Sequence, residues 1–340
     1  MASIPGPREN PAYKIMTESA GYADMGPRTQ IEMSGRDRAA LLHGLCTNDI
    51  KRLVPGCGCE AFLTNVQGKV AGYVYVFCGE ESLVLETSPG QAEKIIRGIE
   101  RYIIREKVSM SDLSSYRPEL LLAGPQAEAR LSEHFQVDLP REMFSHRKVQ
   151  LRDQAISIRR VPFLMPHSFL VSGEASCLTE LRTEFDRTGI APCDAETLES
   201  LRVESGTPLY GRDISEANLP QEVGRTDKAI SFRKGCYLGQ ETVARLDAMG
   251  HVNRQLMGLK FPTANVPPAG AELKIEDKVA AHITSVAWSP RLQAPLALAY
   301  IRRGHCSPGS PLPSEYGTCE VLALPLPGSN AQVAVHCGGP

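Results

Sequence analysis

Helical periodicity is clearest between residues 91 and 107, where Ala92, Ile95, Ile99 and Tyr102 recur three or four positions apart with charged residues between them. This spacing places the apolar side chains on one face of an amphipathic helix. Shorter segments with the same pattern follow a capping residue or a proline, or end at a glycine. They predict helices over residues 38–45, 126–135, 175–187 and 195–203.

Short apolar runs bounded by turn residues lie between these helices and predict strands. Strands that alternate with single helices favour small α+β units of the split-βαβ type. The first 30 residues are rich in Pro and Gly, and we expect them to be partly loose at the start. The predicted strands cover residues 61–65, 72–78, 82–87, 119–123, 155–160 and 168–171.

The pattern changes near His251. Beyond this residue helical periodicity disappears, Pro and Gly become frequent, and short apolar runs remain at residues 256–261, 281–287, 297–301 and 319–324. Many short strands separated by turn residues are typical of a small β-barrel. We therefore predict an α+β region over residues 1–250, built from two subdomains, and a C-terminal β-barrel domain over residues 251–340.

Composition narrows the classes of protein that fit. The chain has 340 residues, 42% hydrophobic and 22% charged, which is typical of a globular protein and not of a disordered one. Lys and Arg number 37 against 39 Asp and Glu, and the formal charge of −2 gives no general reason to bind nucleic acid or an anionic membrane. No apolar run approaches the roughly 18 residues of a membrane helix, and we expect no secretory signal at the N-terminus. Ten cysteines are too few for a disulfide scaffold, so we expect a reducing compartment, the cytoplasm.

Polar residues that could carry chemistry are densest between residues 199 and 245. Charged side chains between apolar ones at the exit of a helix are typical of a functional site. A helix C-terminus followed by a solvated loop would give the same pattern, so both interpretations stay open. This first group comprises Arg202, Glu204, Tyr210, Arg212 and Asp213.

A second group surrounds Cys236. Gly235 and Gly239 allow the backbone to turn sharply and to approach a ligand. Lys234 and Arg233 precede the thiol, and nearby cations favour the reactive thiolate. An inert structural cysteine at a tight turn is the alternative interpretation.

The run over residues 229–245 contains Lys234-Gly-Cys-Tyr-Leu-Gly-Gln-Glu241 and resembles the signature of the YgfZ-type folate-binding proteins. These proteins are relatives of the glycine cleavage T-protein, an aminomethyltransferase, and are implicated in iron–sulfur cluster assembly or repair. Other segments are similar to the same family in the same order, so the resemblance covers residues 30–325. These segments are residues 34–50, 62–69, 201–211, 282–290 and 296–302.

The resemblance implies a GcvT-like ring of α+β units, partly ferredoxin-like, around a pocket for tetrahydrofolate or a one-carbon-substituted form, with a small β-barrel at the C-terminus. Glu204 aligns with the T-protein glutamate that holds the pterin, whose adjacent N–H and amino donors suit an acceptor-only carboxylate. Tyr210 and Asn65 are expected in the same pocket, and Gln240 is expected to contribute to cofactor binding. Cys236 would be the reactive thiol that faces the folate or a client protein.

Lys234 is the second residue that we assign to the chemistry, because it would shape the surroundings of this thiol. One departure from the T-protein matters. That protein carries a pair of aspartates after its Gly-turn, one of which assists aminomethyl transfer, but Ala71, Gly72 and Tyr73 supply no carboxylate here. Loss of an acid–base group typically costs a factor of about 10²–10⁴ in rate.

This departure favours the YgfZ branch and leaves open whether the chain catalyses a reaction. A folate-dependent aminomethyltransferase or other one-carbon transferase is the first alternative, and a non-catalytic interaction scaffold is the second. The expected partners are a folate and iron–sulfur client or assembly proteins, and the resemblance favours a monomer. We predict a turn and no metal site at Cys57-Gly-Cys59, because no second pair with ligand spacing follows. Cluster ligation by Cys57, Cys59 and Cys236 stays open.

Overall fold

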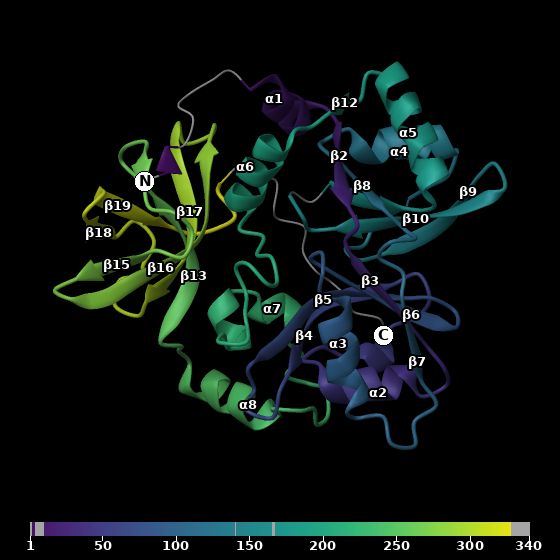
Figure 1. Cartoon of the computed structure of the whole chain (residues 1–340), viewed down its shortest axis with the longest axis horizontal. Helices are drawn as coiled ribbons and strands as arrows, with labels where there is room; N and C mark the ends of the chain where they lie inside the picture. Colours follow the sequence, from purple (N-terminus) through teal and green to yellow (C-terminus); the bar gives the residue numbers. More distant parts are fainter. Residues whose placement is uncertain (1, 4–9, 140, 165–166, 328–340) are drawn as a thin grey trace.

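Three units surround a common centre in the computed structural model, which describes residues 2–3, 10–139, 141–164 and 167–327. Two of them are α+β units and the third is a β-barrel (Figure 1). The α+β class and the C-terminal barrel that we expect from the sequence are therefore confirmed. None of the helices in the described part of the chain is long and apolar enough to cross a membrane.

The first unit is a five-stranded sheet with two α-helices and a short 3₁₀ helix on one face. Successive side chains of a strand point to opposite faces. Leu63, Val74 and Val76 therefore pack under the helices, whereas Phe62 and Tyr73 face the centre of the molecule. The strand order is β4 (Gly58–Thr64), β5 (Val70–Cys78), β6 (Ser82–Thr87), β3 (Thr29–Ser34) and β7 (Ser109–Asp112), and the helices are α2 (Arg38–Leu45), η1 (Ile50–Arg52) and α3 (Ala92–Glu100).

The second unit is a six-stranded sheet that is covered in the same way. Leu120 and Leu122 pack against its two helices, and Leu121 and Ala123, which alternate with them along the same strand, face the centre. The strand order is β12 (Ala191–Pro192), β2 (Gly21–Gly26), β8 (Glu119–Ala123), β11 (Ser168–Ser172), β10 (Gln154–Val161) and β9 (His146–Leu151), and the helices are α4 (Ala127–Phe135) and α5 (Ala175–Arg187).

The third unit is a nearly closed barrel of six strands with its own apolar core. A two-stranded pair of β1 (Ala2–Ser3) and β14 (Asn265–Val266) adds to it. The strand order is β15 (Glu272–Ile275), β16 (Lys278–Ser289), β17 (Ala294–Arg302), β13 (Arg254–Lys260), β19 (Gly317–Leu322) and β18 (Pro311–Ser314).

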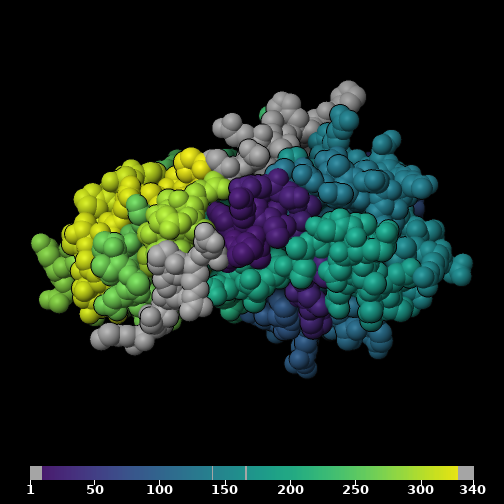
Figure 2. All heavy atoms as spheres, turned by 90° about the horizontal axis from the view of Figure 1, so that it is seen from above, coloured from purple at the N-terminus to yellow at the C-terminus, as the bar shows by residue number. Residues whose placement is uncertain are grey.

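Helices between the units bring them together. Helix α6 (Ala195–Ser205) packs against β16, and η2 (Pro220–Val223), α7 (Thr226–Ala229) and α8 (Gln240–Met249) lead from the centre to the barrel. Helix α1 (Pro11–Glu18) lies between the barrel and the second unit, as the purple N-terminal atoms show (Figure 2). A central apolar cluster draws residues from all three units and surrounds the candidate site.

Several predicted elements match the structure in full, including 38–45, 82–87, 119–123 and 175–187. The predicted helix 91–107 is wrong beyond Glu100. There the backbone forms a turn through hydrogen bonds between residues three apart, and the Tyr102 side chain is 37% exposed. The chain then returns as β7 and pairs with β3. The expected loose start falls on a stretch in which residues 1 and 4–9 lie outside the described part, whereas residues 10–30 form α1, β2 and the start of β3. The predicted boundary near His251 falls between α8 and β13.

Candidate functional site

Cys236 lies exposed on a loop that is fixed to the first unit at several points. The backbone N–H of Leu238 donates to Gly44 O at 2.9 Å, and the Thr64 hydroxyl donates to Leu238 O at 2.6 Å. On the other side of the thiol, Ser231 N donates to Thr47 O at 2.9 Å. The thiol is thus presented to solvent by a loop whose backbone is held in place.

Lys234 supplies the strongest of these attachments. Its ammonium group donates to the carbonyls of His43 (2.5 Å), Cys46 (2.7 Å) and Asn48 (2.9 Å), so all three of its protons are used. The His43 and Cys46 carbonyls lie at the C-terminal end of helix α2, where a cation is favoured by the helix dipole, and Asn48 follows in the segment before η1. Burial lowers the pKa of Lys234, and the side chain is only 6% exposed. Lys234 therefore orders the Cys236 loop through the backbone.

Gly239 provides the second fixed point. It adopts φ +76°, and a Cβ atom there would lie 2.3 Å from Asn65 O and 2.6 Å from Gly68 Cα. Only glycine tolerates this approach in the left-handed region. Asn65 closes the β4–β5 turn, because its side-chain oxygen accepts from Gln67 N and Lys69 N, both at 3.0 Å. Gln240 begins α8 and is half-buried. The structure therefore places Asn65 and Gln240 beside the Cys236 loop.

Glu204 lies elsewhere, on the last turn of α6, and is 3% exposed. Its carboxylate accepts from the Tyr13 hydroxyl at 2.7 Å, from the Ser289 hydroxyl at 2.5 Å and from Arg291 N at 3.4 Å. Burial and the adjacent Glu204 raise the pKa of Tyr13, so this hydroxyl stays protonated and remains a donor. This carboxylate is therefore a hydrogen-bond acceptor whose donors come from α1 and from the barrel, and we call it the Glu204 acceptor site.

Tyr210 lines a narrow central cavity that has room for about one water molecule. Its hydroxyl donates to Ala71 O at 2.5 Å, and the Lys94 ammonium lies 5.0 Å from the centre of its ring. Aromatic rings from both α+β units form much of the wall. The lining residues are Arg28, Tyr73, Tyr75, Glu86, Thr87, Ser88, Phe163, Pro208, Leu209 and Tyr210.

Two arginines and two glutamates form a buried box, and two of the four, Arg28 and Glu86, also line the cavity. Arg159 lies 3.0 Å from Glu86 and 2.8 Å from Glu119, and Arg28 lies 3.0 Å from Glu86 and 3.4 Å from Glu119. All four side chains are at most 5% exposed. Burial, and then the charge of Glu86, raise the pKa of Glu119 to about 8 against the opposing effect of both arginines. The box joins the sheets of the two α+β units.

The positions where the T-protein carries aspartates hold no acid. The Tyr73 hydroxyl donates to Glu60 at 2.5 Å, and the same glutamate forms an ion pair with Arg225 at 2.8 Å. Glu60 is fully buried and reaches the centre from β4. Both partners bind its Oε2, whereas its Oε1 has no hydrogen-bond partner among the described residues. Ala71 contributes a carbonyl, and Gly72 packs against Leu63.

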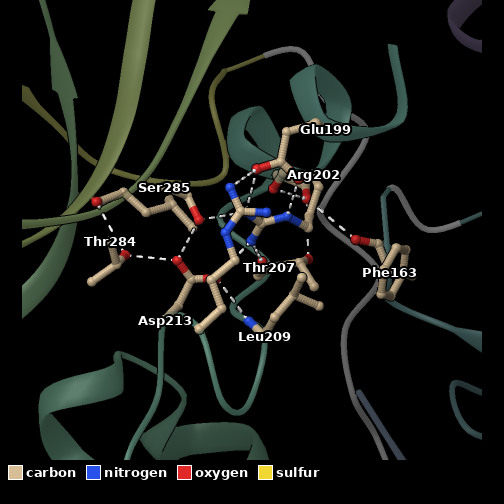
Figure 3. A network of polar contacts seen from close by, with 11 residues as sticks. Phe163, Glu199, Arg202, Thr207, Leu209, Asp213, Thr284 and Ser285 are labelled. Carbon is tan, nitrogen blue, oxygen red and sulfur yellow. Dashed lines mark hydrogen bonds and ion pairs between the residues drawn. The ribbon is translucent and has the colours of Figure 1, made fainter. Parts of the chain in front are cut away.

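Arg202 and Asp213 fix the loop that carries Tyr210 to the barrel (Figure 3). Arg202 donates to Asp213 at 2.8 Å, to Thr207 O at 2.7 Å and to Ser285 at 2.6 Å. Thr284 donates to the second oxygen of Asp213 at 2.6 Å. Arg202 and Asp213, two members of the polar group that the sequence places at the end of a helix, therefore form a joint between α6, its following loop and the barrel.

The candidate residues thus form three neighbourhoods: the Cys236 loop, the Glu204 acceptor site and the cavity beside Tyr210. Pattern reasoning missed Tyr13 and Ser289, the hydroxyl donors to Glu204, and it missed the buried box. Glu119 and Arg159 inside apolar strands were a usable signal, because a buried charge needs a partner. Among the described residues, no three His, Cys, Asp or Glu side chains lie together as a metal site.

Comparison with known proteins decides the family. The GCVT N-terminal domain matches residues 10–234, and the glycine cleavage T-protein C-terminal barrel domain matches residues 254–326. The chain belongs to the glycine cleavage T-protein (GcvT) family. Its GcvT-like fold is confirmed by the crystal structure of glycine cleavage system aminomethyltransferase T from Bartonella henselae, with a TM-score of 0.81 at 21% identity over 92% of this chain and 88% of that one.

Relatives within the GcvT family are similar over most of their length. An aminomethyltransferase from Nostoc sp. is 26% identical over 310 residues, which is 89% of this chain and 82% of the relative. A second aminomethyltransferase, from Rippkaea orientalis, is 24% identical over 93% of this chain and 88% of its own length. A putative chloroplastic transferase from Arabidopsis thaliana is 26% identical over 84% of this chain and 66% of its own. Kinship with the aminomethyltransferases is thus confirmed.

Proposed function

We propose that the chain is a tetrahydrofolate-binding protein of the YgfZ type, which uses the Cys236 thiol to support assembly or repair of iron–sulfur enzymes in the cytoplasm. The observation that carries this proposal is the Cys236 loop. Its thiol is exposed, while Lys234 and Gly239 hold the backbone on both sides of it. An ordered, accessible thiol is what nucleophilic or ligand-exchange chemistry on a partner requires.

Folate binding is supported by the chemistry of the centre. Tyr73, Tyr210 and Phe163 offer aromatic faces to a pterin ring. Glu204 offers a buried carboxylate to the adjacent N–H and amino donors of that ring. The cavity is narrow, Glu204 is not among its lining residues, and Glu204 already accepts from Tyr13 and Ser289. Binding of one pterin to both therefore requires side chains to move apart between the cavity and Glu204, and Tyr13 and Ser289 to release or share the carboxylate.

Calorimetric titration of tetrahydrofolate tests this site. Glu204→Gln keeps the size of the side chain but replaces one acceptor oxygen with a donor, so we expect binding to weaken by a factor of about 10 or more. Glu196→Gln on the same helix is the matched control, because Glu196 is exposed, and it should bind as the unmodified chain does. Equal binding by the Glu204→Gln protein would place the pterin elsewhere.

The role of the thiol is tested in cells that lack this chain and depend on an iron–sulfur enzyme. Cys236→Ser should fold normally, because the side chain is exposed, yet fail to restore the activity of the enzyme. Cys306→Ser, at a half-buried cysteine of the barrel, should restore it. Full restoration by Cys236→Ser would remove the thiol from the mechanism and leave the scaffold interpretation.

An aminomethyltransferase is the second candidate, because relatives over nearly the full length carry that name. The lack of a carboxylate at Ala71, Gly72 and Tyr73 counts against it. Glu60, the nearest acid described above, binds Arg225 and Tyr73 through one of its two oxygens. Turnover of an aminomethylated carrier protein to methylenetetrahydrofolate by the purified chain would establish this activity. Folate binding without turnover supports the YgfZ-type function.

A further inference from the structure

Cys57 and Cys78 face each other at the open end of the β4–β5 hairpin. The antiparallel register pairs Gly58 with Phe77 and Cys59 with Val76, so one further step brings Cys57 opposite Cys78. The backbone confirms this pairing, because Cys78 N donates to Cys57 O at 2.8 Å and Gly56 N donates to Cys78 O at 2.9 Å. Gly56 has φ +87°, so Gly56 and Cys57 together oppose Cys78 as a bulge that begins with a left-handed glycine.

Strand parity places both thiols on the same face of the sheet. On β4, Cys59 and Ala61 pack toward the helices of the first unit, and Cys57 follows the same alternation. On β5, Val76 and Cys78 pack toward that face as well. Residues directly opposite in an antiparallel pair have Cα atoms about 4.5–5.5 Å apart. This spacing lies within the range of about 4.4–6.8 Å that a disulfide bridges.

The two thiols differ in access. Both are free, but Cys57 is half-buried whereas Cys78 is 8% exposed. Burial raises the pKa of Cys78, and the neighbouring Cys57 raises it further, against the effect of Arg38. The more accessible Cys57 is therefore the group that can meet a dissolved reagent, and Cys78 is placed to react with it afterwards.

We propose that Cys57 and Cys78 form a reversible dithiol–disulfide site whose substrate is a low-molecular-weight disulfide such as oxidised glutathione. The Cys57 thiolate attacks one sulfur of the reagent, which breaks the S–S bond and releases one thiolate. The Cys78 thiolate then attacks the Cys57 sulfur and releases the second. The two protons of the cysteines end on the two released thiols, so the protein pair is oxidised and the reagent reduced.

This site is independent of the proposed folate-dependent function. Cys236 belongs to a loop at the opposite end of the same hairpin, where Gly239 meets the Gly68 turn. The β4–β5 ladder pairs Cys59 with Val76, so no cysteine lies opposite Cys59 in this ladder. Cys59 is therefore a matched control on the same strand and the same face.

The purified full-length chain is incubated with excess oxidised glutathione, its remaining thiols are alkylated, and a digest is mapped without reductant. We expect a peptide pair linked through Cys57 and Cys78 that disappears after reduction. Cys59→Ser should keep this cross-link, and Cys57→Ser should lose it. The same treatment in denaturant should lose the preference for this pair, because the fold imposes it.

Two results would overturn the proposal. One is a map in which Cys57 carries a single glutathione while Cys78 is recovered as an alkylated thiol in the folded chain. The other is a cross-link between Cys57 and Cys59 that persists in Cys78→Ser. Far-UV circular dichroism of each variant shows whether it is folded. Cys59→Ser is the control with which Cys57→Ser and Cys78→Ser are compared, because it also lacks one thiol.

Discussion

The Cys236 loop and the joint around α6 are both held by a buried cation, but the partners of the two cations differ. Lys234 donates to three backbone carbonyls at and just after the end of α2. Arg202 instead binds the carboxylates of Glu199 and Asp213 and the Ser285 hydroxyl of the barrel. Any sequence offers carbonyls, whereas the joint needs particular side chains from three parts of the chain.

This difference explains what each region can do. Backbone anchoring keeps the Cys236 loop ordered while its thiol stays free for a partner. In the joint, the charged groups pair with one another. The joint therefore fixes the position of the barrel on the α+β units, and its charged groups are not available to bind a ligand. A variant that removes a cation should therefore cost more at the joint, where it leaves a buried carboxylate, than at the loop.

Arg202→Met gives the largest expected effect. It leaves the fully buried Asp213 without its cation, and breaking such a pair typically costs about 3–5 kcal/mol. Urea unfolding measures the loss. The control is Arg212→Met, which removes an ion pair with the same Glu199 from a side chain that is 44% exposed, and it should cost at most about 1 kcal/mol. Equal losses for the two variants would mean that the joint does not depend on the buried charge.

The buried box of two arginines and two glutamates makes the junction of the α+β units sensitive to pH. The pKa of Glu119 is about 8 in the folded chain, above the ordinary value of 4.5. Between these values the folded state holds a proton that the unfolded state has lost, so stability falls as the pH rises from about 4.5 to about 8. Glu119→Gln should flatten this part of the curve of melting temperature against pH. Lys234→Met, at the loop, should lower the melting temperature at every pH without changing the slope of the curve. If the slope survives in Glu119→Gln, another titrating group is responsible for it.

Sequence patterns predicted the elements whose contacts are local. Residues 175–187 and 38–45 carry their own periodicity and end signals, and the structure has helices at the same bounds. The end of α3 was not predictable in this way, because Ile103 continues the apolar repeat although the chain must turn back to reach β3. Helix α1 was missed although Asn10 caps it and Pro11 begins it, a signal that the surrounding Pro and Gly residues obscured.

The candidate site was predictable as far as single residues and a motif can show. Cys236 is exposed on a tight turn, as its flanking glycines suggested. The hydrogen bonds of the Lys234 ammonium were not predictable, because the carbonyls that accept them lie about 190 residues away in the sequence. The same holds for Glu204, whose donors Tyr13 and Ser289 come from α1 and the barrel. Contacts between distant segments depend on the complete fold.

The two glycines beside Cys236 sharpen the comparison inside the loop itself. Gly239→Ala puts a Cβ atom against Asn65 O and keeps φ +76°, so we expect a loss of about 1–3 kcal/mol in stability. Gly235→Ala meets no heavy atom within 4 Å, and its effect should be small. Thermal unfolding compares the two. A larger loss in Gly235→Ala would show that the loop is held at a different point.

Tyr13→Phe gives the smallest expected change and separates two roles for the acceptor site at Glu204. The variant removes one hydrogen bond to the carboxylate, which should cost about 1 kcal/mol in stability. If the Tyr13 hydroxyl competes with the pterin for Glu204, tetrahydrofolate should bind up to about tenfold more tightly, since the carboxylate regains a free acceptor. Tyr22→Phe removes a similar hydroxyl bond, to Asp186 at 2.8 Å, on the second unit and should leave the affinity unchanged. Weaker binding in Tyr13→Phe alone would mean that this hydroxyl orients Glu204 for the ligand, whereas unchanged binding in both variants would place the ligand away from α1.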